Sequence, residues 1–411
     1  MGDFGKALQQ LSPRGRSFGD QLKLLGSRWL KEPMQSTLDS SDILPSGETE
    51  STPLGSHYVI RVVHPHDYFH GKVRLSRLSS ADIESLMTLM HESGTVPARD
   101  RIVFLDTETT GVQSGAGICP FLVGLGYFSG DEFHMLQYFI RDFDEEPSML
   151  YALAEFLEGF DMVVTYNGAA FDLPLVDARF TLSRLDNPFK TMSHLDLLFT
   201  ARRLWKNGHG SCRLIALERE IISFMRGPDV PGSMIPQAYF DYLQHRPSPT
   251  LKGVFSHNVY DVVSLAALTV QACDRVILEP APLDDSLDLY SLGRILQNSQ
   301  LWRRSIQLYD MALAGGLSEP ARQKALENLA VVCRRAGDHG RSRDICTELM
   351  RYSEFSMTGY EGAAIYYERV AGDFDKALQI LEDGLRRAES KRWKMLLKAR
   401  WDRLQQKVMV W

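Results

Sequence analysis

Short apolar runs alternate with amphipathic stretches between residues 101 and 276, and this pattern is typical of an α/β domain. Apolar runs bounded by turn-forming residues predict buried strands at Ile102–Leu105, Phe121–Phe128, Phe133–Ile140 and Met162–Tyr166. The stretches between and after them predict helices at residues 147–159, 171–184, 194–205, 211–224, 236–245 and 257–276. A meander of three strands, followed by a helix, a strand and further helices, indicates a mixed sheet flanked by helices.

The chain before this domain has a weaker pattern. Residues 1–57 are rich in Ser, Pro, Gly and charged residues, so we expect a mostly disordered N-terminal arm. Residues 58–100 contain a strand-like stretch and an amphipathic helix from about Ser80 to Glu92. We expect this segment to be an N-terminal extension that packs on the α/β domain, which we place at residues 101–280.

The chain after Pro282 has a wholly helical and periodic pattern. Gly337-Asp338 recurs as Gly372-Asp373 thirty-five residues later, and each pair precedes a helix with small and apolar residues at matching positions. This period resembles that of tetratricopeptide repeats, in which stacked helix pairs bury a shared face. We therefore expect an all-α repeat domain at residues 285–411, which could recruit a protein partner. Its last segment, residues 386–411, is basic and could be either a solvated helix face or a nucleic-acid contact.

Composition narrows the class of protein. Of the 411 residues, 44% are hydrophobic and 24% are charged, which fits a globular chain of two or three domains. The longest near-apolar run, Ile118–Phe128, is too short to span a bilayer, and no apolar signal segment follows Met1, so we expect a cytoplasmic protein without a membrane segment. Five scattered cysteines argue against a disulfide scaffold or a zinc ribbon. The formal net charge of −6 counts mildly against a large non-specific nucleic-acid surface, but it suits a site that collects divalent cations.

Carboxylates gather at three predicted element ends. Asp106 and Glu108 follow a buried strand, and residues two apart in an extended segment point to the same side. Asp172 falls in the first turn of a helix, and Asp261 shares a helix face with His257 four residues earlier. Each piece alone also fits a structural role, as surface acids, a partner of the helix dipole or a surface His–Asp pair. Together they supply the oxygen ligands that Mg²⁺ prefers and that two-metal phosphodiester hydrolysis requires.

Three segments, FLDTETTG from Phe104, TYNGAAFDLPL from Thr165 and HNVYDVVSL from His257, resemble the three motifs of the DEDD (DnaQ-like) exonucleases, and residues 101–276 resemble the bacterial YprB-like predicted exonucleases. The resemblance implies a ribonuclease H-like fold and metal-dependent 3′-to-5′ removal of nucleotides with two Mg²⁺ or Mn²⁺ ions. By motif match, the implied metal ligands are Asp106, Glu108, Asp172 and Asp261.

The general base in these families is a His five residues before the last Asp, or a Tyr four residues before it. Here His257 stands four residues before Asp261, in the Tyr position. We expect His257 to orient the attacking water, because an imidazole titrates near neutral pH. A contact to phosphate is the alternative role.

Five further residues could bind the substrate. Thr109 opens a turn whose backbone could approach a ligand. Asn167 fits a turn or a substrate hydrogen bond, and Phe171 fits a stacked terminal base or core packing. Arg202 and Arg203 could hold phosphates or flank a solvated loop.

The substrate and the presence of activity stay open. Either DNA or RNA fits, preferably single-stranded. The alternatives are a catalytically weak or silent nucleic-acid-binding scaffold whose repeats recruit a protein partner, and a phosphodiesterase of short oligonucleotides.

Overall fold

The computed structural model describes residues 44–90, 96–111, 117–277 and 285–410. Within these ranges the chain forms two compact units. The first unit contains the described residues of 44–84, 96–198 and 213–271, and the second those of 85–90, 199–212 and 272–410. The division therefore falls inside one long helix, α10 (Thr250–Ile277), earlier than the boundary that the sequence predicts near residue 280.

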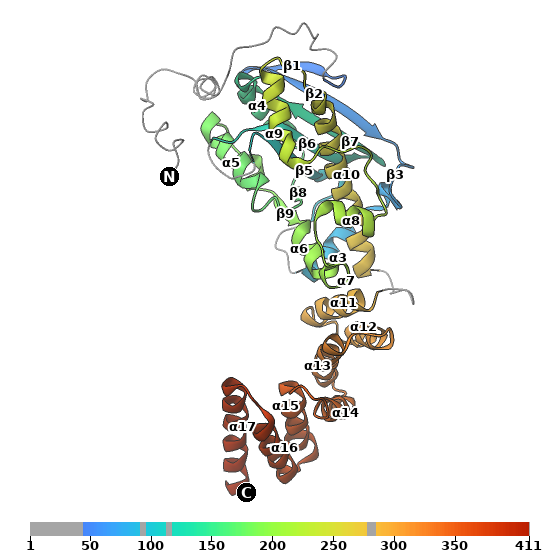
Figure 1. The fold of residues 1–411 in the computed structure, drawn as a ribbon, viewed down its shortest axis with the longest axis vertical. Coiled ribbons are helices and arrows are strands. Elements are labelled where there is room, and N and C mark those ends of the chain that lie inside the picture. Colours follow the sequence, from blue (N-terminus) through green and yellow to red (C-terminus); the bar gives the residue numbers. More distant parts are fainter. Residues whose placement is uncertain (1–43, 91–95, 112–116, 278–284, 411) are drawn as a thin grey trace, which may run out of the picture. The chain divides into compact units, whose positions relative to one another are not determined.

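A seven-stranded mixed sheet forms the centre of the first unit, in the order β1-β2-β7-β6-β5-β8-β9 (Figure 1). Neighbours from β1 to β5 are antiparallel, whereas β5–β8 and β8–β9 are parallel. The strands are β1 (Glu48–Thr52), β2 (Gly55–His64), β5 (Ile102–Thr109), β6 (Pro120–Ser129), β7 (Glu132–Phe139), β8 (Met162–Thr165) and β9 (Ser193–Asp196), and a separate two-stranded sheet pairs β3 (Phe69–His70) with β4 (Val73–Arg74).

The meander of β5, β6 and β7 confirms the predicted strands, and its tight turn has a local cause. Ser129 pairs with Glu132, so only Gly130 and Asp131 connect β6 to β7. Gly130 has φ 60°, which glycine adopts without a steric penalty and which suits the twist of a two-residue hairpin.

Three expectations at the edges of the sheet need correction. The sheet begins at Glu48, inside the segment 1–57 that the sequence predicts to be a disordered arm; the part of that segment before residue 44 lies outside the described residues. Strand β2 pairs with β7, so residues 58–64 of the expected extension are an integral strand. Ser193–Asp196 is strand β9 rather than the first turn of a helix at 194–205, because Met162–Thr165 pairs with it in parallel.

Helices cover the sheet, and aromatic side chains fill the space beneath them. The rings of Phe121 on β6 and Tyr239 on α9 stack with centroids 4.1 Å apart. A buried ion pair between Arg179 and Glu146 joins α5 to α4. The helices from the start of the chain to the division inside α10 are listed here, although the end of α3, most of α6 and all of α7 belong to the second unit: α3 (Ser80–Met90), α4 (Glu146–Leu157), α5 (Asp172–Ser183), α6 (Leu197–Leu204), α7 (Lys206–His209), α8 (Leu214–Glu220), α9 (Ile235–Leu243) and α10.

The described part of residues 285–410 is all helical, as the sequence predicts, and consecutive helices pack on one another. The repeated Gly-Asp pair has a structural reason. Gly337 and Gly372 take positive φ values of 88° and 69°, and the next residue, Asp338 or Asp373, caps the following helix with its side chain. The helices are α11 (Ser286–Asn298), α12 (Trp302–Ala314), α13 (Glu319–Arg335), α14 (His339–Leu349), α15 (Met357–Tyr366), the π-helix η7 (Tyr367–Ala371), α16 (Phe374–Arg387) and α17 (Lys391–Val410).

Within the described ranges, no helix has both the length and the apolar character that crossing a bilayer requires.

Candidate active site

Strand β5 carries the two carboxylates of the first motif to a switch point of the sheet. The chain continues from β5 to β6 and β7 on one side, and later adds β8 and β9 on the other. Strand β8 pairs with β5 only as far as Phe104, so Asp106 and Glu108 extend beyond their parallel neighbour. The crevice outside the carboxyl end of a strand at such a switch point is the usual ligand position in open α/β sheets.

A buried amide orients Asp106. Asn258 on α10 is fully buried and donates from Nδ2 to Oδ2 of Asp106 over 2.9 Å. Its own Oδ1 accepts from Nε2 of Gln137 on β7, also over 2.9 Å. Because Gln137 can only donate from Nε2, it fixes which end of the Asn258 amide faces Asp106. The space for this amide exists because Gly124 on β6 has no side chain, and a Cβ there would lie 2.1 Å from Oδ1 of Asn258.

Asp172 reaches the same strand from the start of α5. Oδ1 of Asp172 accepts a hydrogen bond of 2.6 Å from the hydroxyl of Thr107, the residue between the two carboxylates of β5. Its charge raises the pKa of both Asp106 and Glu108. The second motif therefore joins the first, as the sequence predicts.

The third motif completes a cluster of possible ligands on α10. Glu108, His257 and Asp261 each offer one ligand atom, and these atoms lie within 4.8 Å of one another. Nε2 of His257 is 3.3 Å from Oδ2 of Asp261, as expected for residues four apart on a helix. Nδ1 of His257 lies 2.8 Å from Oδ1 of Asp229, so that carboxylate accepts the Nδ1 proton.

An arginine that the sequence analysis missed lies among these acids. Arg226, in the loop after α8, is bonded to Glu218 through Nη2 at 2.6 Å and to Asp229 through Nη1 at 3.0 Å, and it also pairs with Asp261. Its side chain is 6% exposed. Burial acts to lower the pKa of the Arg226 guanidinium, but the bonds to Glu218 and Asp261 raise it, so the group is a fixed positive charge.

The electrostatics of the cluster favour a cation. Burial is the largest cause that raises the pKa of Asp106 and of Glu108, and the charge of Asp261 is the next. Burial also raises the pKa of Asp172 and of Asp261, although Arg226 and His257 oppose the shift at Asp261. Like charges held this closely repel one another, and a divalent cation relieves both the repulsion and the desolvation.

A further observation indicates that these residues fit a metal ion. Oε1 of Glu108 is buried and has no hydrogen-bond partner among the described residues, and a carboxylate oxygen left in that state is costly. It belongs to the same three-residue group as His257 and Asp261. The carboxylate oxygens of Glu108 and Asp261 are donors that Mg²⁺ and Mn²⁺ accept, and the His257 imidazole lies beside them.

The five residues predicted to bind substrate differ in their exposure and hydrogen bonding. The Thr109 hydroxyl donates to the carbonyl of Gly111 at 2.7 Å. Asn167 has φ 64° and donates its backbone N–H to the buried Asp196 at 2.7 Å, so it lies in a turn, and its side-chain contact with substrate stays a prediction. The Phe171 side chain is 52% exposed, which contradicts core packing. Arg202 and Arg203 are exposed on α6 and belong to the second compact unit.

Comparison with known proteins agrees with this architecture. Residues 103–273 match the family model RNase_H_2, of the RNase_H superfamily. The chain is also similar to the uncharacterized protein YprB of Bacillus subtilis (strain 168), with 29% identity over 337 residues that cover 79% of each chain. The first unit therefore contains an RNase H-like domain, and the matched range includes every residue of the acidic cluster and His257.

Proposed function

We propose that the RNase H-like domain is a metal-dependent 3′-to-5′ exonuclease that hydrolyses the phosphodiester bonds of nucleic acid, preferably of single strands. The observation that carries the proposal is the convergence of acidic side chains from β5, α5 and α10 near Glu108, whose buried Oε1 finds no partner in the part of the chain that the structure describes. The 3′-to-5′ direction rests on the resemblance of the three motifs to the DEDD exonucleases.

Asp106, Glu108, Asp172 and Asp261 would hold two Mg²⁺ or Mn²⁺ ions. Such ions polarise the phosphoryl oxygens and lower the pKa of a bound water. The protein prepares these carboxylates in advance: Asn258 fixes the orientation of Asp106, and the Thr107 hydroxyl fixes that of Asp172. Glu108 is buried and the other three carboxylates are partly buried, which reduces the screening of their charge by bulk water.

His257 would accept the proton of the attacking water at Nε2. Asp229 accepts from Nδ1, which turns Nε2 toward Asp261 and Glu108; with those carboxylates on the metal ions, Nε2 would be free to accept a proton. A carboxylate behind an imidazole fixes its tautomer and stabilises the imidazolium that forms on proton transfer. The position four residues before Asp261 therefore suits a base even though His replaces Tyr there.

The five further residues would bind the substrate. The exposed Phe171 ring precedes Asp172 directly, and we propose that it stacks the terminal base. Thr109 and Asn167 would contact the terminal nucleotide, and Arg202 and Arg203 would contact backbone phosphates.

The test uses end-labelled single-stranded DNA and RNA of equal sequence with Mn²⁺, Mg²⁺ or EDTA. Wild type should give a ladder that shortens from the 3′ end only when metal is present, and Asp106→Ala should abolish it. Asp144→Asn is the matched control, because Asp144 is an exposed carboxylate outside the cluster. Cleavage that survives both EDTA and Asp106→Ala would overturn the proposal, and no cleavage of either strand would favour the silent scaffold.

A further inference from the structure

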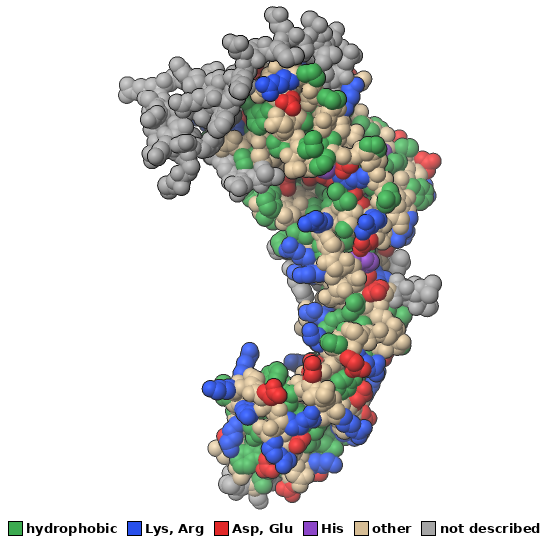
Figure 2. Space-filling model, viewed as in Figure 1, with side chains coloured by type: hydrophobic (Ala, Val, Ile, Leu, Met, Phe, Trp, Pro, Cys, Tyr) green, Lys and Arg blue, Asp and Glu red, His purple; other side chains and the backbone are tan. Residues whose placement is uncertain are grey.

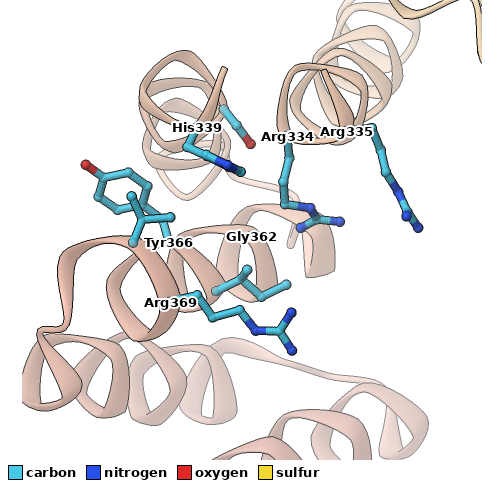
Figure 3. Close-up of a pocket in the computed structure, with 9 residues that line it drawn as sticks. Arg334, Arg335, His339, Gly362, Tyr366 and Arg369 are labelled. Carbon is cyan, nitrogen blue, oxygen red and sulfur yellow. The ribbon is translucent and has the colours of Figure 1, made fainter. Parts of the chain in front are cut away.

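Helices α13, α14 and α15 and the π-helix η7 enclose a basic pocket of about 440 Å³ in the second unit (Figure 3). Its walls carry three arginines, Arg334 and Arg335 from the end of α13 and Arg369 from η7, together with His339 at the start of α14. The volume lies within the usual range of ligand pockets. The site-forming side chains come from consecutive helices, so the pocket belongs to this unit alone.

Among the residues that the structure describes, these three arginines lack the carboxylate partners that other arginines of the second unit have. Arg341 pairs with Asp310, and Arg400 lies 3.2 Å from Glu368, which also accepts from Lys407 at 2.7 Å. Much of the basic C-terminal segment is thus neutralised internally. Within the described residues, Arg334, Arg335 and Arg369 have no ion pair or side-chain hydrogen bond. In a protein with a net charge of −6, three unneutralised guanidinium groups around one pocket favour an anionic ligand.

Arg334 and Arg369 occupy distinct positions on the pocket wall. Arg334 extends from α13 over Gly362 of α15 (Figure 3), where an added Cβ would lie 3.9 Å from Nη1 of Arg334 and 2.4 Å from Sγ of Cys346. The Cys346 sulfur therefore requires a glycine at 362, whereas Arg334 lies at ordinary van der Waals distance from this position. Arg369 lies in a π-helix, a rare conformation that is frequently found at functional sites. Basic side chains are also numerous on the visible face of this unit (Figure 2).

The polar chemistry of the walls distinguishes between anions. The lining residues include no Asp, Glu, Asn or Gln, and the Ser342 hydroxyl already donates to the carbonyl of Ala330 at 2.8 Å. The pocket therefore offers donors and few acceptors. A peptide would bring backbone N–H groups that need acceptors, whereas a phosphodiester brings oxygens only. Arginine forks match phosphate oxygens, and the Tyr366 ring on the wall, whose hydroxyl accepts from Arg343 at 3.2 Å, offers a face to a base.

We propose that this pocket binds the sugar-phosphate backbone of a single-stranded nucleic acid, with Arg334, Arg335 and Arg369 on its phosphates. The inference rests on the proposed function in that it names the same class of ligand for a second site on the chain. It assigns nucleic-acid affinity to the helical region, independent of the metal cluster.

The test measures fluorescence anisotropy of a labelled single-stranded oligonucleotide in EDTA, so that binding is read without cleavage. Arg334→Gln/Arg369→Gln should weaken binding about tenfold and reduce the slope of log affinity against log salt by about two. Arg351→Gln/Arg392→Gln is the matched control, since it removes the same charge from exposed arginines outside the pocket and should change affinity less than twofold. Arg369→Gln alone, at an exposed position, gives a second reading if the double variant unfolds.

If the pocket variant and the control variant lose equal affinity for the oligonucleotide, the proposal is overturned, because the loss would then depend on net charge alone. A pocket variant that keeps oligonucleotide binding but loses binding of a polyglutamate peptide would also overturn it and make the occupant an acidic protein segment. The binding result can be distinguished from the result of the nuclease assay. Pocket-dependent binding with no cleavage by wild type sustains this inference and removes the proposed function, and cleavage with pocket-independent binding does the reverse.

Discussion

Asn258 on α10 and Asp106 on β5 are joined by a hydrogen bond of 2.9 Å from Nδ2 to Oδ2. The bond links the first and third motifs directly, and Gln137 supports it from β7. An amide in the buried helix face thus performs two tasks: it holds the long helix on the sheet and it fixes a carboxylate that would hold metal. Stability and activity should therefore change together at this position.

Replacing Asn258 with Ala should lower the free energy of unfolding by about 2 kcal/mol, because it leaves a buried carboxylate and one bond of Gln137 unpaired. Metal-dependent cleavage should fall at least about tenfold, since Asp106 loses its orientation. Urea unfolding and the 3′-end ladder check the two effects on one preparation. Full activity in a destabilised variant would show that the bond serves the fold only.

Removing one carboxylate from the cluster should have opposite effects on stability and activity. In Asp106→Asn the amide oxygen can still accept from Asn258, but one of the repelling charges is gone. We expect a higher melting temperature than wild type in EDTA, a smaller rise on addition of Mn²⁺, and at least about a thousandfold loss of cleavage. Thermal melts with and without Mn²⁺, with Asp144→Asn alongside, provide the check. A large Mn²⁺ response in the variant would count against Asp106 as a ligand.

Asp229 should act through His257. Asp229→Asn keeps an oxygen near Nδ1 but removes the charge that stabilises an imidazolium, so kcat should fall about 10- to 100-fold with little change in KM. In a His257→Ala background the same substitution should cost almost nothing further, because the two residues act as a unit. Full additivity of the two losses in kcat is the result that contradicts this role.

Local patterns in the sequence predicted the interior of the sheet and the acidic motifs. Strands β5, β6, β7 and β8 consist of apolar runs, and their burial leaves little choice of structure. Asp106 and Glu108 were found because they end such a run, Asp172 because it begins a helix, and Asp261 because it lies four residues after His257. The edge strands β1 and β9 were missed because their residues are polar and only pairing with β2 and β8 makes them strands.

The supporting residues of the site were beyond sequence reasoning for a different reason. Arg226 and Asp229 lie in a loop with Gly227 and Pro228, a composition that is typical of a solvated turn. Their function depends on tertiary contacts with Glu218 and Asp261, which no spacing reveals. Gln137 did carry a signal, since it is a polar residue inside an apolar strand and such residues need a buried partner.

Arg226 should be more important for stability than any single acid around it. Arg226→Gln leaves Glu218, Asp229 and Asp261 without their shared cation, and breaking a buried ion pair by removing one partner costs about 3–5 kcal/mol. Mn²⁺ should restore part of this loss if it binds Asp261. Arg226→Lys keeps the charge without the planar fork and should cost less. Urea unfolding of both variants, with EDTA or with Mn²⁺, measures these effects. If Arg226→Gln is as stable as wild type, the ion pairs of Arg226 make no net contribution to stability.

Acid should destabilise the fold through His70, which lies outside the acidic cluster. Its Nε2 is 2.8 Å from the Ser264 hydroxyl, and its ring packs against Phe224 with centroids 3.8 Å apart. Burial, with smaller contributions from His64 and Arg226, lowers the pKa of His70 from 6.5 to about 3. Between these two pH values His70 is protonated in the unfolded chain and neutral in the folded chain. The free energy of unfolding therefore rises with pH in this range, and stability is lost as pH falls below 6.5.

The loss assigned to His70 should reach about 2 kcal/mol between pH 8 and pH 5. His70→Gln places an amide near the position of Nε2 and cannot titrate, so its comparison with wild type separates His70 from the carboxylates, which titrate in both proteins. Wild type should lose about 2 kcal/mol relative to His70→Gln over this range in urea unfolding. A difference between the two proteins that stays constant with pH would mean that His70 is equally protonated in the folded and unfolded chains, which its buried position beside Phe224 argues against.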